Sequence, residues 1–172
     1  MPLTANITRA FAPRTKPFKV VPDDLLQLDS DVEEALWFSG HDWRGITWQD
    51  WQEHSCAIFF LRPEAFAYYL PSLLLLSAQN PNDCLNAADS LIFLLDCSPN
   101  PDGWPAGLAN RFLELNRVEL GVLKEWLLQV CEYLPYKGVG PSASGPGDRF
   151  GRAFDTLALL QEEVEKRSRA SG

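Results

Sequence analysis

Residues 116–134 read NRVELGVLKEWLLQVCEYL, the stretch over which helical periodicity of apolar residues continues longest in the chain. Its apolar residues form one stripe at every fourth position and a second stripe beside it: Val118, Val122, Trp126, Val130 and Leu134, then Leu120, Leu123 and Leu127. This spacing is typical of an amphipathic helix with one face in a core. Asn116 is a favoured capping residue, and Glu119 can reach back to it, so the helix is predicted to begin here.

Helical signals extend outward from this stretch in both directions. Ser30 and Thr47 are each followed three positions later by an acidic residue, which is typical of a helix N-terminus. Pro63 fits the first turn of a further helix, which Pro71 is expected to kink or restart. The pattern predicts helices over residues 30–38, 47–55, 63–70, 72–78, 84–96, 107–115, 118–134 and 149–167.

The predicted fold class is therefore all-α, a single compact multi-helix domain of about six to eight helices. Residues 56–61 are apolar enough for a buried strand, but a lone strand has no ladder partner. Residues 1–21 contain three prolines and no sustained period, which indicates an extended N-terminal arm. The helical domain then covers residues 22–170, with a mobile Gly/Pro/Ser loop predicted at 135–148.

The charge of the chain is concentrated in one part of the sequence. The 172 residues carry a formal net charge of −8, and residues 21–100 hold 13 acidic residues against two basic ones. Such a block steers a basic partner into contact, and it also keeps a protein soluble as a plain solvated face. Nucleic acid is excluded as a direct partner, because phosphate binding requires clustered Lys and Arg.

Targeting and redox signals are few. The N-terminus has no apolar h-region and the longest apolar run is far too short to span a bilayer, so we expect a cytoplasmic protein without a membrane segment. The four cysteines, Cys56, Cys84, Cys97 and Cys131, lie 28, 13 and 34 residues apart, which fits no zinc or redox motif. A reducing compartment agrees with that usage.

One group of residues could bear chemistry. Asp50 and His54 are four positions apart on a predicted helix and could share a metal with His41 and Glu53, as in a small metal-dependent hydrolase. The alternative is structural, with Asp50 pairing with an imidazole near a helix C-terminus. No nucleophile elbow or phosphate loop is present in the sequence. We therefore expect a protein that is not an enzyme and has no cofactor.

Aromatic residues are more informative. Four tryptophans, Trp37, Trp43, Trp48 and Trp51, fall within fifteen residues among charged neighbours, as in interface hot spots. At least two of them are expected in the core, and Trp43, between two charged residues, is expected to be the most exposed. The predicted partner-binding residues are Asp23, Asp24, Asp29, Asp31, Glu33, Glu34, Asp42, Trp43, Trp48, Asp50, Trp51 and Glu53.

Residues 60–71 read FLRPEAFAYYLP, and this run resembles the signature F-L-x-P-E-A-F-x-Y-Y-L-P of a family of small bacterial proteins of unknown function. Gly45-Ile46-Thr47-Trp48 and the helix after Asn116 also fit that family, so the resemblance covers residues 30–134. Its members look like single-domain proteins encoded beside polymorphic toxins. By analogy of class, the resemblance implies an immunity protein of a type VI or contact-dependent secretion system.

Two main hypotheses follow from the sequence. The first is a cytosolic immunity protein that neutralises a basic toxin, expected to be a nuclease, through an acidic surface containing tryptophan. The second is the metal-dependent hydrolase that uses His41, Asp50, Glu53 and His54. A structural subunit of a larger complex is a third possibility. The oligomeric state is left open by the sequence.

Overall fold

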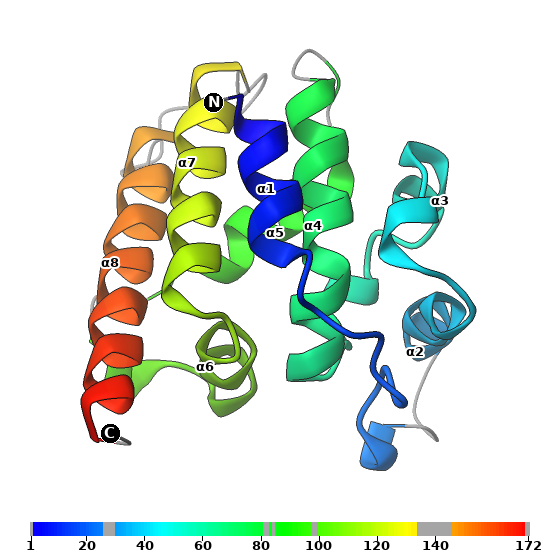
Figure 1. Ribbon diagram of the computed structural model, residues 1–172, viewed down its shortest axis with the longest axis horizontal. Helices are drawn as coiled ribbons and strands as arrows, with labels where there is room; N and C mark the ends of the chain where they lie inside the picture. Colours follow the sequence, from blue (N-terminus) through cyan, green and yellow to red (C-terminus); the bar gives the residue numbers. More distant parts are fainter. Residues whose placement is uncertain are drawn as a thin grey trace.

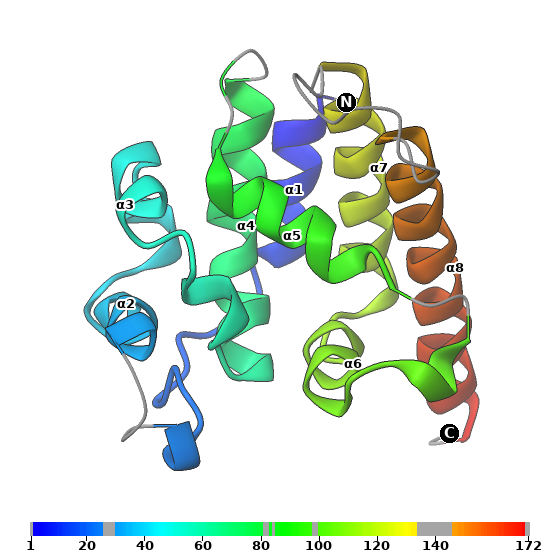
Figure 2. The same cartoon turned by 180° about the vertical axis from the view of Figure 1, so that it is seen from behind.

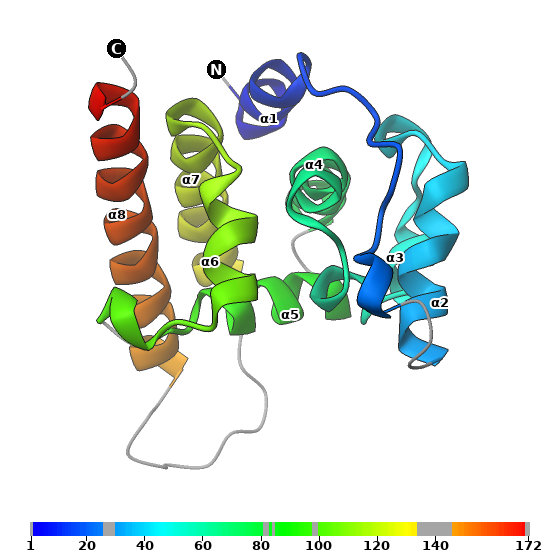
Figure 3. The same cartoon turned by 90° about the horizontal axis from the view of Figure 1, so that it is seen from below.

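Helix α4 (Pro63–Gln79) lies at the centre of the fold (Figure 3). Eleven of its 17 residues are buried, because other elements cover it on several sides. Pro63 stands in the first turn, where its missing N–H costs nothing. The helix does not restart at Pro71 but continues through it, so tertiary packing outweighs the roughly 3 kcal/mol that an interior proline costs.

The computed structural model describes residues 2–25, 30–80, 83, 85–97, 100–133 and 146–170. Over these ranges the chain forms eight α-helices, five short 3₁₀ turns and no strand, which confirms the all-α fold class (Figure 1). Besides α4, the helices are α1 (Leu3–Phe11), α2 (Ser30–Trp37), α3 (Trp48–Glu53), α5 (Asn86–Leu95), α6 (Ala106–Leu113), α7 (Arg117–Tyr133) and α8 (Pro146–Ala170). The 3₁₀ turns are η1 (Asp23–Leu25), η2 (Phe38–Gly40), η3 (Trp43–Gly45), η4 (Ala57–Phe59) and η5 (Pro101–Gly103).

The helices are arranged around α4 in a simple way. Seen from below, α1 covers one side of α4 and α5 crosses the opposite side (Figure 3). Helices α7 and α8 lie side by side beyond α1, and α2 and α3 lie at the other end of the molecule (Figures 1 and 2). No helix in the described part of the chain is long and apolar enough to cross a bilayer.

The start that the sequence predicts for the long amphipathic helix α7 is confirmed. The Asn116 side chain accepts hydrogen bonds from the backbone N–H groups of Val118 and Glu119, and the Glu119 carboxylate accepts from the Asn116 N–H. The stripes are only partly as expected, since Val118 is 64% exposed while Leu120, Leu123, Trp126 and Leu127 are fully buried. Leu134 lies outside the described residues.

The prediction of an extended arm over residues 1–21 is wrong for its first half. Leu3–Phe11 forms helix α1, which packs against α4 and α7 and buries Ile7 and Phe11 completely. The helix has no side-chain cap, so the usual start signal is missing from the sequence. Residues 12–22 are non-helical and run across the molecule to η1, and we call them the strap.

The strap is fixed at its far end. Val20 and Val21 are buried, and the Val20 carbonyl accepts a hydrogen bond of 2.8 Å from the Arg62 N–H at the start of α4. The strap therefore connects α1 to the end of the molecule that carries α2 and α3.

Two further predictions concern the remaining segments. The possible strand over residues 56–61 does not form, because η4 occupies Ala57–Phe59. Helix α8 begins at Pro146, three residues before the predicted start, so the proposed loop does not extend to residue 148. Residues 135–145 of that loop lie outside the described residues, and the prediction of mobility is not tested there.

Candidate interaction surface

The excess of acidic over basic residues falls in one segment of the chain, at one end of the fold. We call residues 23–59, from η1 to η4, the acidic lobe. Of the 23 acidic and 15 basic residues in the chain, nine acids and one base (Arg44) fall in this lobe, so the remaining 14 of each sign balance. Its helices α2 and α3 lie across α4 from α7 and α8 (Figures 1 and 3). The net charge of the protein is thus the charge of one lobe.

Three of the predicted carboxylates hold the lobe together. Asp50 completes the capping box of α3, accepting from the Thr47 N–H at 2.7 Å. Glu34 accepts from the Cys56 N–H at 3.1 Å and so connects α2 to the turn that leads into η4.

Asp42 accepts from the Arg44 N–H and from the Tyr68 hydroxyl, each at 2.9 Å. The first of these bonds, followed by the bond from Tyr68, holds the pKa of the Asp42 carboxyl below its ordinary value. These bonds give Asp50, Glu34 and Asp42 structural roles.

The other predicted carboxylates face solvent to different degrees. Asp23, Asp24, Glu33 and Glu53 are exposed, and Asp31 is half-buried. Asp23 is paired with Lys19 at 2.7 Å, and Glu53 accepts from Gln49 at 2.8 Å. Asp29 lies outside the described residues. Asp24 and Glu33 are exposed and form no ion pair with another described residue, so they are the carboxylates that we expect a partner to reach.

Two of the predicted tryptophan anchors are inaccessible. Trp43 is only 2% exposed, which makes the expectation of an exposed Trp43 wrong, and the Arg44 guanidinium covers its ring at 4.5 Å. Trp51 is also buried and donates from its indole nitrogen to Ser72 Oγ at 2.9 Å. That at least two of the four tryptophans belong to the core is confirmed. Trp37 and Trp48 are half-buried, so of the predicted anchors only Trp48 is open to a partner.

Three of the four residues of the hydrolase hypothesis, all but the exposed Glu53, have structural contacts within the lobe. The rings of His41 and His54 both stack on Trp37, with centroid distances of 3.9 and 4.6 Å. Asp50 is engaged in its capping box, as described above. Among the residues that the structure describes, no group of three or more His, Cys, Asp or Glu side chains is placed to hold a metal ion.

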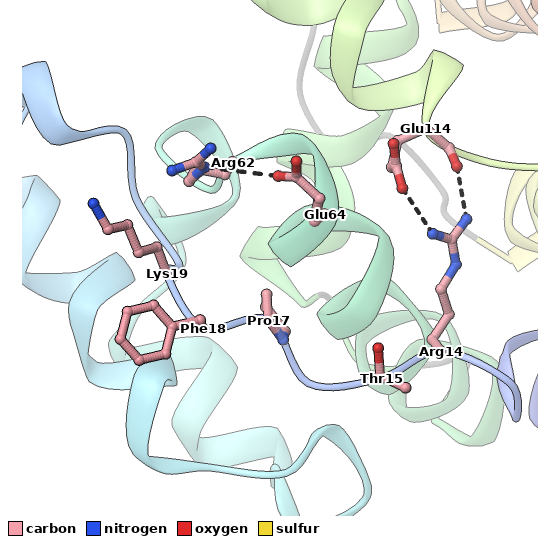
Figure 4. A pocket seen from close by; sticks show the side chains of 8 residues that line it. All are labelled: Arg14, Thr15, Pro17, Phe18, Lys19, Arg62, Glu64 and Glu114. Atoms are coloured by element: carbon pink, nitrogen blue, oxygen red, sulfur yellow. Dashed lines mark hydrogen bonds and ion pairs between the residues drawn. The ribbon is translucent and has the colours of Figure 1, made fainter.

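The strap presents an aromatic residue that the sequence did not single out. Phe18 is 98% exposed and stands at the edge of a pocket of about 470 Å³ between the strap, the start of α4 and the segment after α6 (Figure 4). No periodic pattern surrounds Phe18, so nothing in the sequence distinguishes it from a core phenylalanine. A fully exposed Phe beside charged residues is the composition of a contact anchor.

The charges around this pocket are largely paired. Arg14 pairs with Glu114 at 3.0 Å, and Arg62 pairs with Glu64 at 3.7 Å (Figure 4). Lys19, which belongs to the same pocket, pairs with Asp23 of the acidic lobe, as noted above. Of these three basic residues, Arg14 and Arg62 thus pair with acids outside the acidic lobe, and Lys19 pairs with Asp23 inside it.

Comparison with known proteins adds no assignment. No protein-family model, no curated protein and no solved structure matches this chain.

Proposed function

We propose that this protein is a bacterial immunity protein that binds a basic toxin, expected to be a nuclease acting in the cytosol, and blocks it with the acidic lobe. The observation that supports this most is the separation of charge described above, with nine acids and one base in residues 23–59 and a balanced remainder. A surface of one sign attracts a partner of the opposite sign and raises its rate of association. The resemblance of residues 60–71 to proteins encoded beside toxins supports the same assignment.

The acidic lobe and the strap that leads into it contain both parts that such an interface needs. Exposed carboxylates, with Asp24 and Glu33 foremost, supply attraction at long range. Trp48 on α3 and Phe18 on the strap supply apolar area, which controls how long the complex lasts. Trp43 and Trp51 support this surface from within the core.

The first test is rescue from toxicity. The product of each reading frame adjacent to this gene is expressed in a bacterial host with and without this protein. We expect one product to stop growth, and co-expression to restore it and to yield a stable complex. If no neighbouring product is toxic, or if the toxic one is not rescued, the assignment is wrong.

The second test locates the surface on that complex. The double variant Asp24→Lys/Glu33→Lys should slow association with the toxin by roughly 10-fold or more at low salt, with a weaker effect at high salt. The matched control is Asp155→Lys/Glu162→Lys on α8, which makes the same charge change at exposed residues of the opposite end. Equal slowing by the two pairs would show that the effect comes from the net charge of the protein, and it would contradict an interface at the acidic lobe.

The anchors are tested by dissociation. Phe18→Ala and Trp48→Ala should each speed dissociation, with a loss of about 2 kcal/mol for the true anchor and little dependence on salt. Binding kinetics across an ionic-strength series separate this effect from that of the carboxylates. Unchanged dissociation in both variants would show that the contact lies elsewhere on the protein.

A further inference from the structure

A second pocket lies mostly outside the acidic lobe and touches it at Phe59. It has a volume of about 480 Å³ and is formed by η4, the end of α5, the segment around η5 and the start of α6. Figure 2 shows α5 and α6 on the side that faces the reader. Aromatic rings of Phe59, Phe93 and Trp104 line it, together with Leu94 and Arg111. This volume falls within the range of pockets that hold small organic ligands.

Arg111 gives this pocket its chemical character. Its Nε–H donates to the Leu61 carbonyl at 2.9 Å, and its Nη2 donates to the Phe59 carbonyl. A guanidinium has five N–H groups, so three of them, including both on Nη1, have no acceptor among the described residues. Arg111 also forms no ion pair with a carboxylate in the described part of the chain, and burial lowers its pKa from the ordinary value.

The acid in the pocket does not supply the missing negative charge. Asp96 also lines the pocket, but its carboxylate accepts from Arg152 and lies 3.9 Å from Arg149. Asp96 is thus engaged by Arg149 and Arg152, and among the described residues it forms no ion pair with Arg111.

We propose that this pocket binds a small organic carboxylate whose apolar or aromatic body lies against Phe59, Phe93 and Trp104 and whose carboxylate pairs with Arg111. A carboxylate accepts two parallel hydrogen bonds from a guanidinium, and the free N–H groups of Arg111 suit that geometry. The exposed ring of Phe93, 61% accessible, would be covered by the ligand. The proposal does not depend on the immunity function, since the pocket and the acidic lobe share only Phe59 at the end of η4.

The test compares matched ligands by isothermal titration calorimetry on the full chain. The probes are phenylacetate, indole-3-acetate and decanoate, each beside its neutral amide. At least one carboxylate should bind saturably and roughly 10- to 100-fold more tightly than its amide, because hydrogen bonds to charged groups contribute most. No saturable binding by any of the three carboxylates up to millimolar concentration, or equal binding of acid and amide, overturns the proposal.

Two variants connect that binding to the pocket. Gly107 lines it, and a Cβ built there meets nothing within 4 Å, so Gly107→Leu should fill the pocket without strain and abolish binding. Gly121→Leu on α7 is the matched control. Gly121 does not line this pocket, and a Cβ built there also meets nothing within 4 Å. Binding that survives Gly107→Leu, or that both variants reduce equally, contradicts the assignment.

Arg111→Gln tests the charge itself. It keeps an amide N–H for the backbone carbonyls but removes the cation, so the affinity for the carboxylate should fall to that for the amide while the amide affinity is unchanged. A purely structural role of Arg111 would weaken both ligands alike and would overturn the charge-pairing part of the proposal. If this variant does not fold, the acid-to-amide ratio and the glycine pair still decide the question.

Discussion

Among single residues, Glu119 connects two segments that lie far apart in the sequence, and its local sequence pattern predicts only one of these contacts. It is 1% exposed, accepts from Asn116 at the start of α7, and pairs with Arg14 of the strap at 2.6 Å. The side-chain hydrogen bond to Glu119 is the largest of the contacts that raise the pKa of Arg14. One buried carboxylate thus serves as a helix cap and as the attachment point of the N-terminal segment.

Removing that carboxylate should be costly. We expect Glu119→Ala to lower the free energy of unfolding by about 3 kcal/mol, because it leaves the half-buried Arg14 without its main partner and removes a cap. Glu114→Ala, which removes the more exposed partner of Arg14, should cost less than about 1 kcal/mol. Urea denaturation of both variants measures the difference. Similar losses would show that Glu119 carries no special weight.

Asp42 predicts a dependence of stability on pH. Its folded-state pKa is held low, mainly by the Arg44 N–H, so its contribution to stability is present above the ordinary Asp pKa of about 4 and is lost as the pH falls through the lower folded value. The stability gap between the wild type and Asp42→Asn should therefore be largest near neutral pH and close in acid.

Thermal unfolding from pH 7 to pH 2 checks this dependence. Tyr68→Phe removes only the hydroxyl that donates to Asp42, so it should reduce the change of stability with pH in part. If the difference in melting temperature between the wild type and Asp42→Asn stays constant from pH 7 to pH 2, the pH dependence does not come from Asp42.

Among the elements, α1 differs most from what the sequence indicates. Leu3, Ile7 and Phe11 are spaced four apart and face α4 and α7. The element is nine residues long and lacks a side-chain cap, so its helical state depends on tertiary packing more than on local signals. The strap, in contrast, is non-helical as expected.

Because α1 is part of the core, Phe11→Ala should destabilise the whole protein by about 3–5 kcal/mol. Lys16→Ala, at an exposed position of the strap, should change stability by less than about 0.5 kcal/mol. Denaturant melts followed by far-ultraviolet circular dichroism compare the two. A loss confined to the few residues of α1, with the main transition unchanged, would show that the helix is peripheral.

The sequence predicted the elements that carry their own start signals and missed features that depend on distant partners. Thr47 and Asn116 are visible as caps because their hydrogen bonds are local. The burial of Trp43 could not be read from its charged neighbours, because Asp42 is satisfied by Tyr68 from α4, 26 residues further along. The position of Arg111 at a pocket could not be predicted from the sequence either, since its acceptors Phe59 and Leu61 lie some fifty residues away.

Across the whole molecule, the fold turns a charge block of the sequence into a charged end. Carboxylates confined to one lobe repel each other at closer range than the same number spread over the surface. Partner attraction and self-repulsion therefore arise from the same residues.

This self-repulsion should be measurable without any partner. Asp24→Lys/Glu33→Lys should raise the melting temperature at low ionic strength, and the gain should shrink in about 0.5 M NaCl, where screening acts over a few ångströms. The control pair Asp155→Lys/Glu162→Lys should give a smaller gain, because α8 lies outside the acidic lobe. Melting curves at two salt concentrations measure both. Equal gains from the two pairs would contradict a local origin of the repulsion.

The pairing of Arg14 with Glu119 also has a consequence for biosynthesis. Helix α1 is made before α7, whose anchoring carboxylate is translated more than 100 residues later. At roughly 5–20 residues per second, the ribosome needs about 5–20 s to supply them. During that interval the apolar face of α1, with Ile7 and Phe11, has no α7 to cover it, so nascent chains should be a target for chaperones that hold short hydrophobic segments. A segment that is made early is thereby among the last to reach its final place.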